Sequence, residues 1–500
     1  MGKYDFKLGT AKLAIPYPEN FFPYHSWGPR RLTGVHDDLF VRAVYIKEPG
    51  ELLLVSVDNG DIDPAWVGKL SETVGIPAPN ILIFISHTHT APYIGGYWPE
   101  AVDDVEKSER YTALAWETVV KAVKAAMAET APAALRYTVG HCDVNICRDN
   151  PEQDPETGNT VYRIGRNARG YSDKNVYIMS FIREDGTVAA VLFSYSVHSS
   201  ILFGAAMEEG GQLASGDLAG YAMDSVEKSL GHGAVALFAM APAADQNPRY
   251  MAMYEYTGEN GEKAHGNYGP ASYTLVELQG GDLAEAVLAA LDGRAGTVMD
   301  RPSAVAGVGS VRGAAAELPS AVAGVGSVQG ASERQAGADA GAAVTSSAIP
   351  GANAAVTSTA APGADAPFEV KTVSETIYVP GKVKKEGRGI KWPQSPAEYE
   401  PAEDVPIPLS VTAIGGVGIV SIGCETSSVN APEIRRILAE KGFSDTIIIT
   451  QCNGSSSYMS DAHGYQVVTF SAMASHMMPQ AVDRMFEGVE KLAAAVASGK

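Results

Sequence analysis

Six short apolar runs, each followed by a polar side chain, dominate the pattern along this chain of 500 residues. The runs are rich in Val, Ile, Leu and Phe and end at turn residues, which is typical of buried strands. They span 51–58, 81–86, 189–197, 234–241, 416–423 and 446–451. Residues 108–130, 216–230, 431–442 and 481–497 instead keep apolar residues at helical spacing. This alternation predicts an α/β fold with mixed β-sheets flanked by helices.

The residues that follow these runs are of the kinds that bind metals or act in catalysis. Ligand sites in open α/β sheets lie beyond the carboxyl ends of the strands, so we expect these side chains to converge. Each one alone has a structural alternative: a single histidine is more often a hydrogen-bonded structural residue, and an aspartate can cap the next helix. The polar residues in question are Asp58, His87 with His89, His198, Asp245 with Asn247, Glu425 and Tyr458.

The histidine pair in ILIFISHTHTAP (81–92) is the most informative of these features. Residues i and i+2 of an extended segment share one face, so His87 and His89 are expected to point the same way. Two imidazoles at the end of a buried strand suit a metal site, or one ligand beside one catalytic group.

Residues 297–366 differ in composition from the rest of the chain. They are mostly Ala, Gly, Val, Ser and Pro, contain no aromatic residue, and repeat PSAVAGVGSV from Pro302 and again from Pro319. Without large side chains to bury, such a segment cannot offset its ordering entropy. The sequence therefore predicts a flexible insertion at 297–366 within one domain, whose two parts are residues 1–296 and 367–500.

The overall composition narrows the classes of partner and compartment. A formal net charge of -20 disfavours nucleic acid as a partner, because phosphate binding needs a basic surface. No stretch of 18 apolar residues is present to form a transmembrane helix, and the first residues lack the apolar region of a signal peptide. We therefore expect a cytoplasmic protein. The four cysteines form no C-x-x-C pair, and we expect buried free thiols.

Several segments, in order, resemble the neutral ceramidase family. This zinc amidohydrolase family splits the N-acyl bond of ceramide into sphingosine and fatty acid. The family pattern runs roughly G-I-H-D-x-L-Y-A-R-A, then T-H-T-H-S-G-P, P-V-H-S, G-E and a tyrosine before the last helices. The matching segments are GVHDDLFVRAVYI (34–46), ISHTHTAP (85–92), YSVHSS (195–200), SGDLAGYAM (215–223), IGCE (422–425) and CNGSSSYMSDAHGYQ (452–466).

The resemblance implies a role for each matching residue. It implies that zinc is the cofactor and that a lipid or other small-molecule amide is the substrate. His89 would assist the substrate, and Arg148 resembles the arginine of an N-x-x-R segment that lines the family's site. Zinc lowers the pKa of bound water towards about 7, and the resulting oxyanion would need donors such as His89 and Arg148. The implied zinc ligands are His87, His198, Glu425 and Tyr458.

The sequence departs from the family pattern at two positions near the expected site. Asn247 stands where the family carries a serine once favoured as the nucleophile, and asparagine cannot attack a carbonyl. Phe470 stands where the family has a second tyrosine. Metal-activated water would then be the nucleophile. The same departures motivate an alternative, a non-catalytic binding protein on a ceramidase-like fold. A two-metal phosphatase using Asp58, His87, His89 and Asp245 is a third hypothesis.

Overall fold

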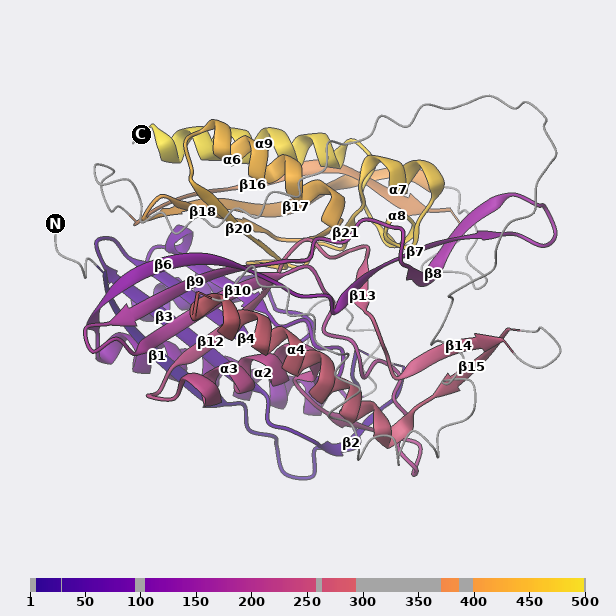
Figure 1. The fold of residues 1–500 in the computed structure, drawn as a ribbon, viewed down its shortest axis with the longest axis horizontal. Helices are drawn as coiled ribbons and strands as arrows, with labels where there is room; N and C mark the ends of the chain where they lie inside the picture. The colour runs from indigo at the N-terminus through magenta and orange to yellow at the C-terminus, as the bar shows by residue number, and fades with distance from the viewer. Residues whose placement is uncertain are drawn as a thin grey trace. The chain divides into compact units, whose positions relative to one another are not determined.

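A computed structural model describes residues 6–27, 29–94, 104–257, 263–293, 370–385 and 399–498. The predicted insertion at 297–366 lies outside the described residues. Two larger sheets lie face to face between two layers of helices, as Figure 1 shows. The fold is thus the mixed α/β type predicted from the alternation of apolar runs and helical segments.

The larger sheet has eight strands in the order β12-β10-β9-β6-β1-β3-β4-β5. Only β4 with β5 and β10 with β12 pair in parallel, and the other neighbours are antiparallel. Its strands are β1 (Phe6–Ala14), β3 (Phe40–Glu48), β4 (Leu52–Val57), β5 (Ile81–Ile85), β6 (Ala131–His141), β9 (Asn175–Arg183), β10 (Val188–Tyr195) and β12 (Val235–Met240).

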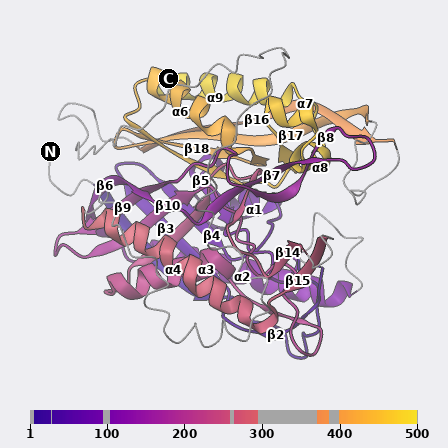
Figure 2. The same cartoon turned by 45° about the vertical axis from the view of Figure 1, so that its right-hand side comes forward.

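The smaller sheet has four strands and is formed late in the chain. Its order is β16-β17-β18-β20, with β18 and β20 parallel. Figure 2 shows it, in orange, between the larger sheet and helices α6 and α9. The strands are β16 (Val370–Lys384), β17 (Tyr399–Ile414), β18 (Val417–Ile422) and β20 (Asp445–Thr450).

Helices cover the outer face of each sheet, because the apolar side chains there need a partner layer. Helices α1 (Ala65–Val74), α2 (Val105–Ala128), α3 (Asp217–Leu230) and α4 (Ser272–Leu291) cover the larger sheet. Helices α6 (Ala431–Glu440) and α9 (Ala481–Ala497) cover the smaller one.

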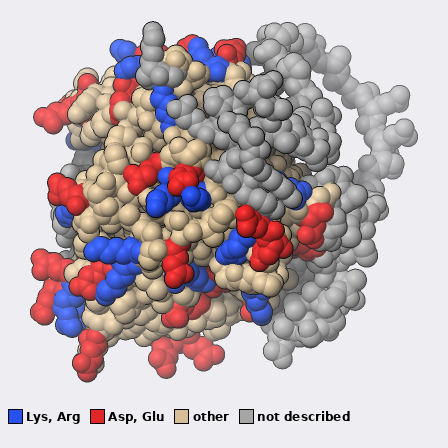
Figure 3. All heavy atoms as spheres, turned by 90° about the vertical axis from the view of Figure 1, so that its left-hand side faces the viewer, with Lys and Arg blue, Asp and Glu red and all other residues tan. Residues whose placement is uncertain are grey.

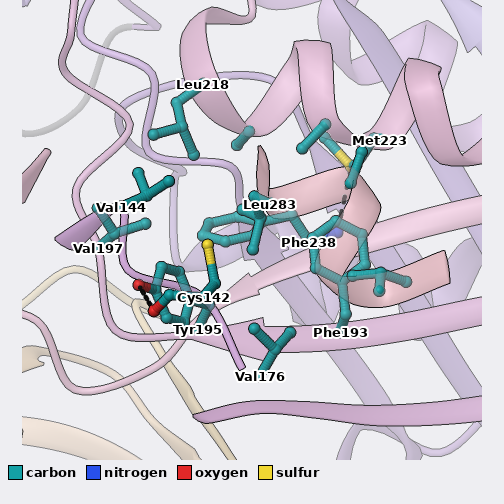
Figure 4. Close-up of a cluster of buried hydrophobic side chains, with 14 of the residues drawn as sticks. Cys142, Val144, Val176, Phe193, Tyr195, Val197, Leu218, Met223, Phe238 and Leu283 are labelled. Atoms are coloured by element: carbon teal, nitrogen blue, oxygen red, sulfur yellow. Dashed lines mark hydrogen bonds between the residues drawn. The ribbon is translucent and has the colours of Figure 1, made fainter. Parts of the chain in front are cut away.

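The alternation of side chains along strand β5 joins these layers. In β5, Ile81, Ile83 and Ile85 pack against α1 and α2, whereas Leu82 and Phe84 face the smaller sheet. Successive side chains of a strand point to opposite faces, and both faces of β5 are buried. This explains why β5 reads as a continuous apolar run. Figure 4 shows the corresponding core under α3 and α4, around Phe193 and Phe238.

Short strands and helices beyond the two sheets carry most of the polar residues. A three-stranded sheet has the order β13-β7-β8, and β2 pairs with β11 and β19 with β21. A hairpin of β14 (Met253–Thr257) and β15 (Lys263–Asn267) belongs mostly to a second, small unit. The other elements are β2 (Leu32–Val35), β7 (Asn145–Gln153), β8 (Thr160–Asn167), β11 (Gln212–Ala214), β13 (Gln246–Pro248), β19 (Glu425–Thr426), β21 (Tyr458–Met459), α7 (Ala462–Val467) and α8 (Phe470–Ala474).

The surface carries charged side chains of both signs (Figure 3), and the cysteines are buried. On the face shown in Figure 3, Lys and Arg side chains are interspersed with Asp and Glu. All four cysteines, Cys142, Cys147, Cys424 and Cys452, are buried free thiols, as expected. Among the described residues, no helix combines the length and apolar character needed to span a membrane.

Candidate metal centre

His87 lies in the turn directly after β5, at the edge of the larger sheet. Its φ angle of 56° is in the left-handed region, which residues with a side chain adopt at a cost and mostly at functional sites. The edge of β5 that pairs with no other strand of the sheet is capped by Asn453. The Asn453 side chain hydrogen-bonds to the backbone of Ile83 and Ile81. The turn is therefore held firmly on the strand that carries it.

His198 follows β10, which belongs to the other end of the same sheet. The sheet is curled so strongly that β12 contacts β5, although the two strands are at opposite ends of its order. This curl brings the His87 and His198 rings to a centroid distance of 5.0 Å. The two imidazoles therefore lie side by side although they are more than 100 residues apart in the chain.

Glu425 lies between the two histidines. Its Oε1 is 3.2 Å from His87 Nε2, and its Oε2 is 3.0 Å from His198 Nε2. Glu425 starts β19, which pairs in parallel with β21 and places Glu425 opposite Tyr458. The structure thus brings His87, His198, Glu425 and Tyr458 together from four separate elements.

Two glutamines hold the inner ligand atoms in place. Gln451 Nε2 donates to Glu425 Oε1 at 2.8 Å. The backbone oxygen of Gln246 is 2.8 Å from His198 Nδ1 and can only accept, so the Nδ1 proton is fixed and the Nε2 lone pair faces Glu425. Metal-binding histidines generally make such a bond with their other ring nitrogen.

Burial controls the charge state of these groups. Burial, helped by the positive charge of Arg148, lowers the pKa of His198 to about 4, so the imidazole is neutral at pH 7. Burial opposes ionisation of Glu425, but His87 and His198 outweigh it and hold the pKa of the carboxyl well below its usual range. Burial and then the charge of Glu425 raise the pKa of Tyr458 to about 12. The group offers two imidazoles, a carboxylate and a phenol.

His89 lies beside His87, next to the ring of Phe203. Its Nε2 is 3.2 Å from His87 Nε2, and its ring is 5.6 Å from the Phe203 ring. Burial lowers the pKa of His89 well below its usual value, so it too is neutral at pH 7. One nitrogen each from His87, His89 and His198 lie within 4.8 Å of one another, so His89 is within reach of a cation at this site as well.

Arg148 lies on β7, beside the phenol of Tyr458. Its guanidinium carbon is 5.5 Å from the centre of the Tyr458 ring and 5.0 Å from that of Phe470. Its Nη1 donates to Asn247 Oδ1 at 3.4 Å. The two residues that depart from the family pattern, Asn247 and Phe470, therefore both contact Arg148.

Asp58 and Asp245 do not join the histidine cluster, contrary to the expectation that all the polar residues after the strands converge. Asp58 forms a buried ion pair with Arg42 at 2.9 Å. Asp245 accepts hydrogen bonds from the backbone and hydroxyl of Ser428. Both carboxylates are occupied by structural partners, which removes two of the ligands that a two-metal phosphatase would need.

Sequence reasoning missed three residues near the site. Gln451 is the last residue of the predicted strand 446–451, and Gln246 lies between the selected residues Asp245 and Asn247, so both were overlooked beside more reactive neighbours. Asp61 lies three residues beyond Asp58 and interacts electrostatically with His87. Burial raises the pKa of Asp61 to about 7. Considering the whole turn after β4, rather than its first acidic residue, would have found it.

We expect Gln451→Met to weaken metal binding by about 10- to 100-fold, the usual effect of losing a residue that orients a ligand. Methionine keeps the volume but cannot donate to Glu425 Oε1. Titration of metal-free protein with zinc measures the change. Gln480→Met, a substitution near the start of α9, is the control, and equal affinities of both variants would show that Gln451 does not position Glu425.

Comparison with known proteins supports the fold. No family model and no curated protein matches the sequence. Among solved structures, the neutral ceramidase from Pseudomonas aeruginosa superposes with a TM-score of 0.65 at 15% identity, covering 100% of this chain and 75% of that one. A ceramidase complexed with C2 gives a TM-score of 0.64 at 14% identity, covering 99% of this chain and 76% of that one. The chain has a neutral ceramidase-like fold. The segments that resemble the family thus lie on the corresponding architecture.

The zinc that the ceramidase-like fold implies can be tested against the residues present. His198 Nε2 and Glu425 Oε2 are buried, face each other at 3.0 Å, and lack a partner in hydrogen-bonding geometry. Two ligands at usual zinc bond lengths in a tetrahedral site are about 3.3 Å apart, close to the separations seen here. Neutral imidazoles and a carboxylate are also preferred zinc ligands. The donor set fits the ion.

Proposed function

We propose that this protein is a zinc-dependent amidohydrolase that cleaves an N-acyl amide. The observation that carries the proposal is the position of Glu425, which spans His87 and His198 with an unpartnered oxygen, on a ceramidase-like fold. A buried carboxylate and two buried imidazoles in this arrangement are costly unless a cation joins them. We assign His87, His198 and Glu425 as zinc ligands, with Tyr458 as the fourth.

Zinc, when bound, supplies Lewis-acid chemistry and lowers the pKa of water to about 7. The protein's own groups then act on the substrate. His89 can donate to the oxyanion that develops when the carbonyl is attacked. Arg148, which lies beside the proposed ligand Tyr458, is the candidate for a second donor to the same oxyanion. Asn247 cannot act as a nucleophile. It accepts a hydrogen bond from Arg148 instead, so its contribution is to position that guanidinium.

The substrate class follows from the neighbours only as a proposal. The two solved neighbours are ceramidases, and a ceramide-like lipid amide is therefore the first substrate to test. Phe203 beside His89, and Phe470 beside Arg148, place apolar rings next to the polar groups. Such a mixture suits an acyl amide better than a fully polar substrate.

A panel of fluorogenic N-acyl substrates tests the proposal directly. We expect turnover by the wild-type protein, loss of turnover in the presence of a chelator, and recovery when zinc is added back. His87→Ala should lose both zinc and turnover. If zinc is retained but no substrate in the panel is cleaved, the non-catalytic binding protein that Asn247 and Phe470 suggest becomes the better account.

A further inference from the structure

Arg148 is a buried cation that interacts electrostatically with the carboxylates of Glu425 and Asp149 but contacts neither of them directly. Its side chain is among the buried polar groups, with the residue 5% exposed. Of its three nitrogens, Nη1 donates to Asn247, whereas Nε and Nη2 have no hydrogen-bond partner. Among the described residues, no carboxylate lies within ion-pair distance of Arg148. Leaving two guanidinium N–H groups unpaired in a buried site is unfavourable, so a ligand is expected there.

Two other arginines, the buried Arg42 and the half-buried Arg435, show how this protein usually satisfies such a charge. Nε and Nη2 of Arg435 also lack a hydrogen-bond partner, but its charge is paired directly. Arg42 makes ion pairs with Asp58, Asp224 and Glu227. Arg435 stacks on the Tyr177 ring at 3.9 Å and pairs with Asp173 at 2.9 Å. Each of these guanidiniums therefore has an anion from the protein itself. Arg148 differs from both because its hydrogen bonds go to the amide of Asn247 and the phenol of Tyr458, and no described carboxylate contacts it.

The free edge of Arg148 has the shape of a carboxylate-binding site. Nε and Nη2 lie on the same side of the planar guanidinium and can bond the two oxygens of one carboxylate in parallel. Tyr458 and Phe470 contact the guanidinium through their rings, and Asn247 fixes its opposite end, so the orientation of that edge is set in advance. A phenylalanine ring also offers no hydroxyl to occupy the free N–H groups. The edge is therefore held in a fixed orientation, with its two N–H groups available to a ligand.

We infer that the Nε and Nη2 edge of Arg148 binds a ligand carboxylate, so that the site accepts acylated amides that bear a carboxylate, such as N-acyl amino acids, or retains the released acid. This inference rests on the proposed function, because it uses the same site. A neutral amide offers a single carbonyl oxygen to this edge, whereas a carboxylate brings a negative charge and an acceptor for each of its two free N–H groups. The carboxylate of an N-acyl amino acid and that of the released acid would bind to this edge in the same way.

Binding to the full-length, chelator-treated protein separates this inference from turnover. Calorimetry would compare N-octanoylglycine with N-octanoylglycinamide, which differ only in the carboxylate, and would also measure octanoate. We expect at least one of the two acids to bind about 10- to 100-fold more tightly than the neutral amide, as a two-bond, charge-assisted contact provides. Arg148→Lys, which keeps the charge but loses the paired N–H groups, should remove most of that advantage. Arg435→Lys, at a half-buried arginine that pairs with Asp173, is the control and should retain it.

The outcomes are distinguishable. A preference for N-octanoylglycine that Arg148→Lys removes assigns the carboxylate to the substrate, and a preference for octanoate alone assigns it to the released acid. Equal binding of all three compounds, or a preference unchanged in Arg148→Lys, would overturn the inference. Because no metal or turnover is needed, a protein that binds acids in this way but hydrolyses nothing would refute the proposed function while leaving the carboxylate site intact.

Discussion

Glu425→Gln reduces amide hydrolysis by more than about 100-fold, since loss of a residue that merely orients a ligand already costs 10- to 100-fold. Glutamine keeps the size of the side chain but removes the negative charge that lies between His87 and His198. The zinc affinity should fall together with the activity. Initial rates at several added zinc concentrations measure both effects, because excess zinc should restore part of the activity.

The control for this prediction is Glu277→Gln on the exposed surface of α4. It makes the same chemical change away from the site and should leave the rate unchanged. An active Glu425→Gln variant with wild-type zinc affinity would show that Glu425 is not a ligand.

His89→Asn is expected to lower kcat by about 100- to 1,000-fold without changing the zinc content, as the loss of one donor to a developing oxyanion does. This variant separates two possible roles of His89, as a donor to the substrate or as a metal ligand. The second role is open because His89 Nε2 is only 3.2 Å from His87 Nε2, near enough to bind the cation itself. Rates and metal content measured on the same sample distinguish the two roles. Exposed His141→Asn serves as the control.

A fall in zinc content together with rate in His89→Asn would assign His89 to the metal instead of the substrate. The ligand set would then be three histidines with Glu425, and the need for Tyr458 as a ligand would disappear. A variant with full activity would remove His89 from both roles.

The buried parallel strands were predictable because burial on both faces leaves a plain apolar run. The six runs correspond to β4, β5, β10, β12, β18 and β20, with ends that differ by a residue or two. Strands such as β6, β16 and β17 were not predicted. Many of their side chains are half-buried or exposed, so polar residues interrupt the run. The sequence therefore showed the two ends of the eight-stranded sheet and one end of the four-stranded sheet, but not the strands between or beside them.

The candidate site was predictable in its residue types but not in its geometry. The family resemblance pointed to His87, His198, Glu425 and Tyr458, and the structure brings them together. Why they meet depends on the curl of the eight-stranded sheet, which joins the ends of β5 and β10 through long-range packing. No local pattern encodes that curl. The ion pair that keeps Asp58 away from the histidines was not predictable either. Its partner Arg42 lies on the neighbouring strand β3, and the sequence does not show which strands pair.

The most direct test of the central claim is the metal content of the purified protein. Elemental analysis of protein prepared without chelators should find about one zinc ion per chain, and His198→Ala prepared in parallel should contain almost none. Wild-type protein that carries no zinc, and takes up none on dialysis against it, would contradict the assignment of His87, His198 and Glu425 as a metal centre.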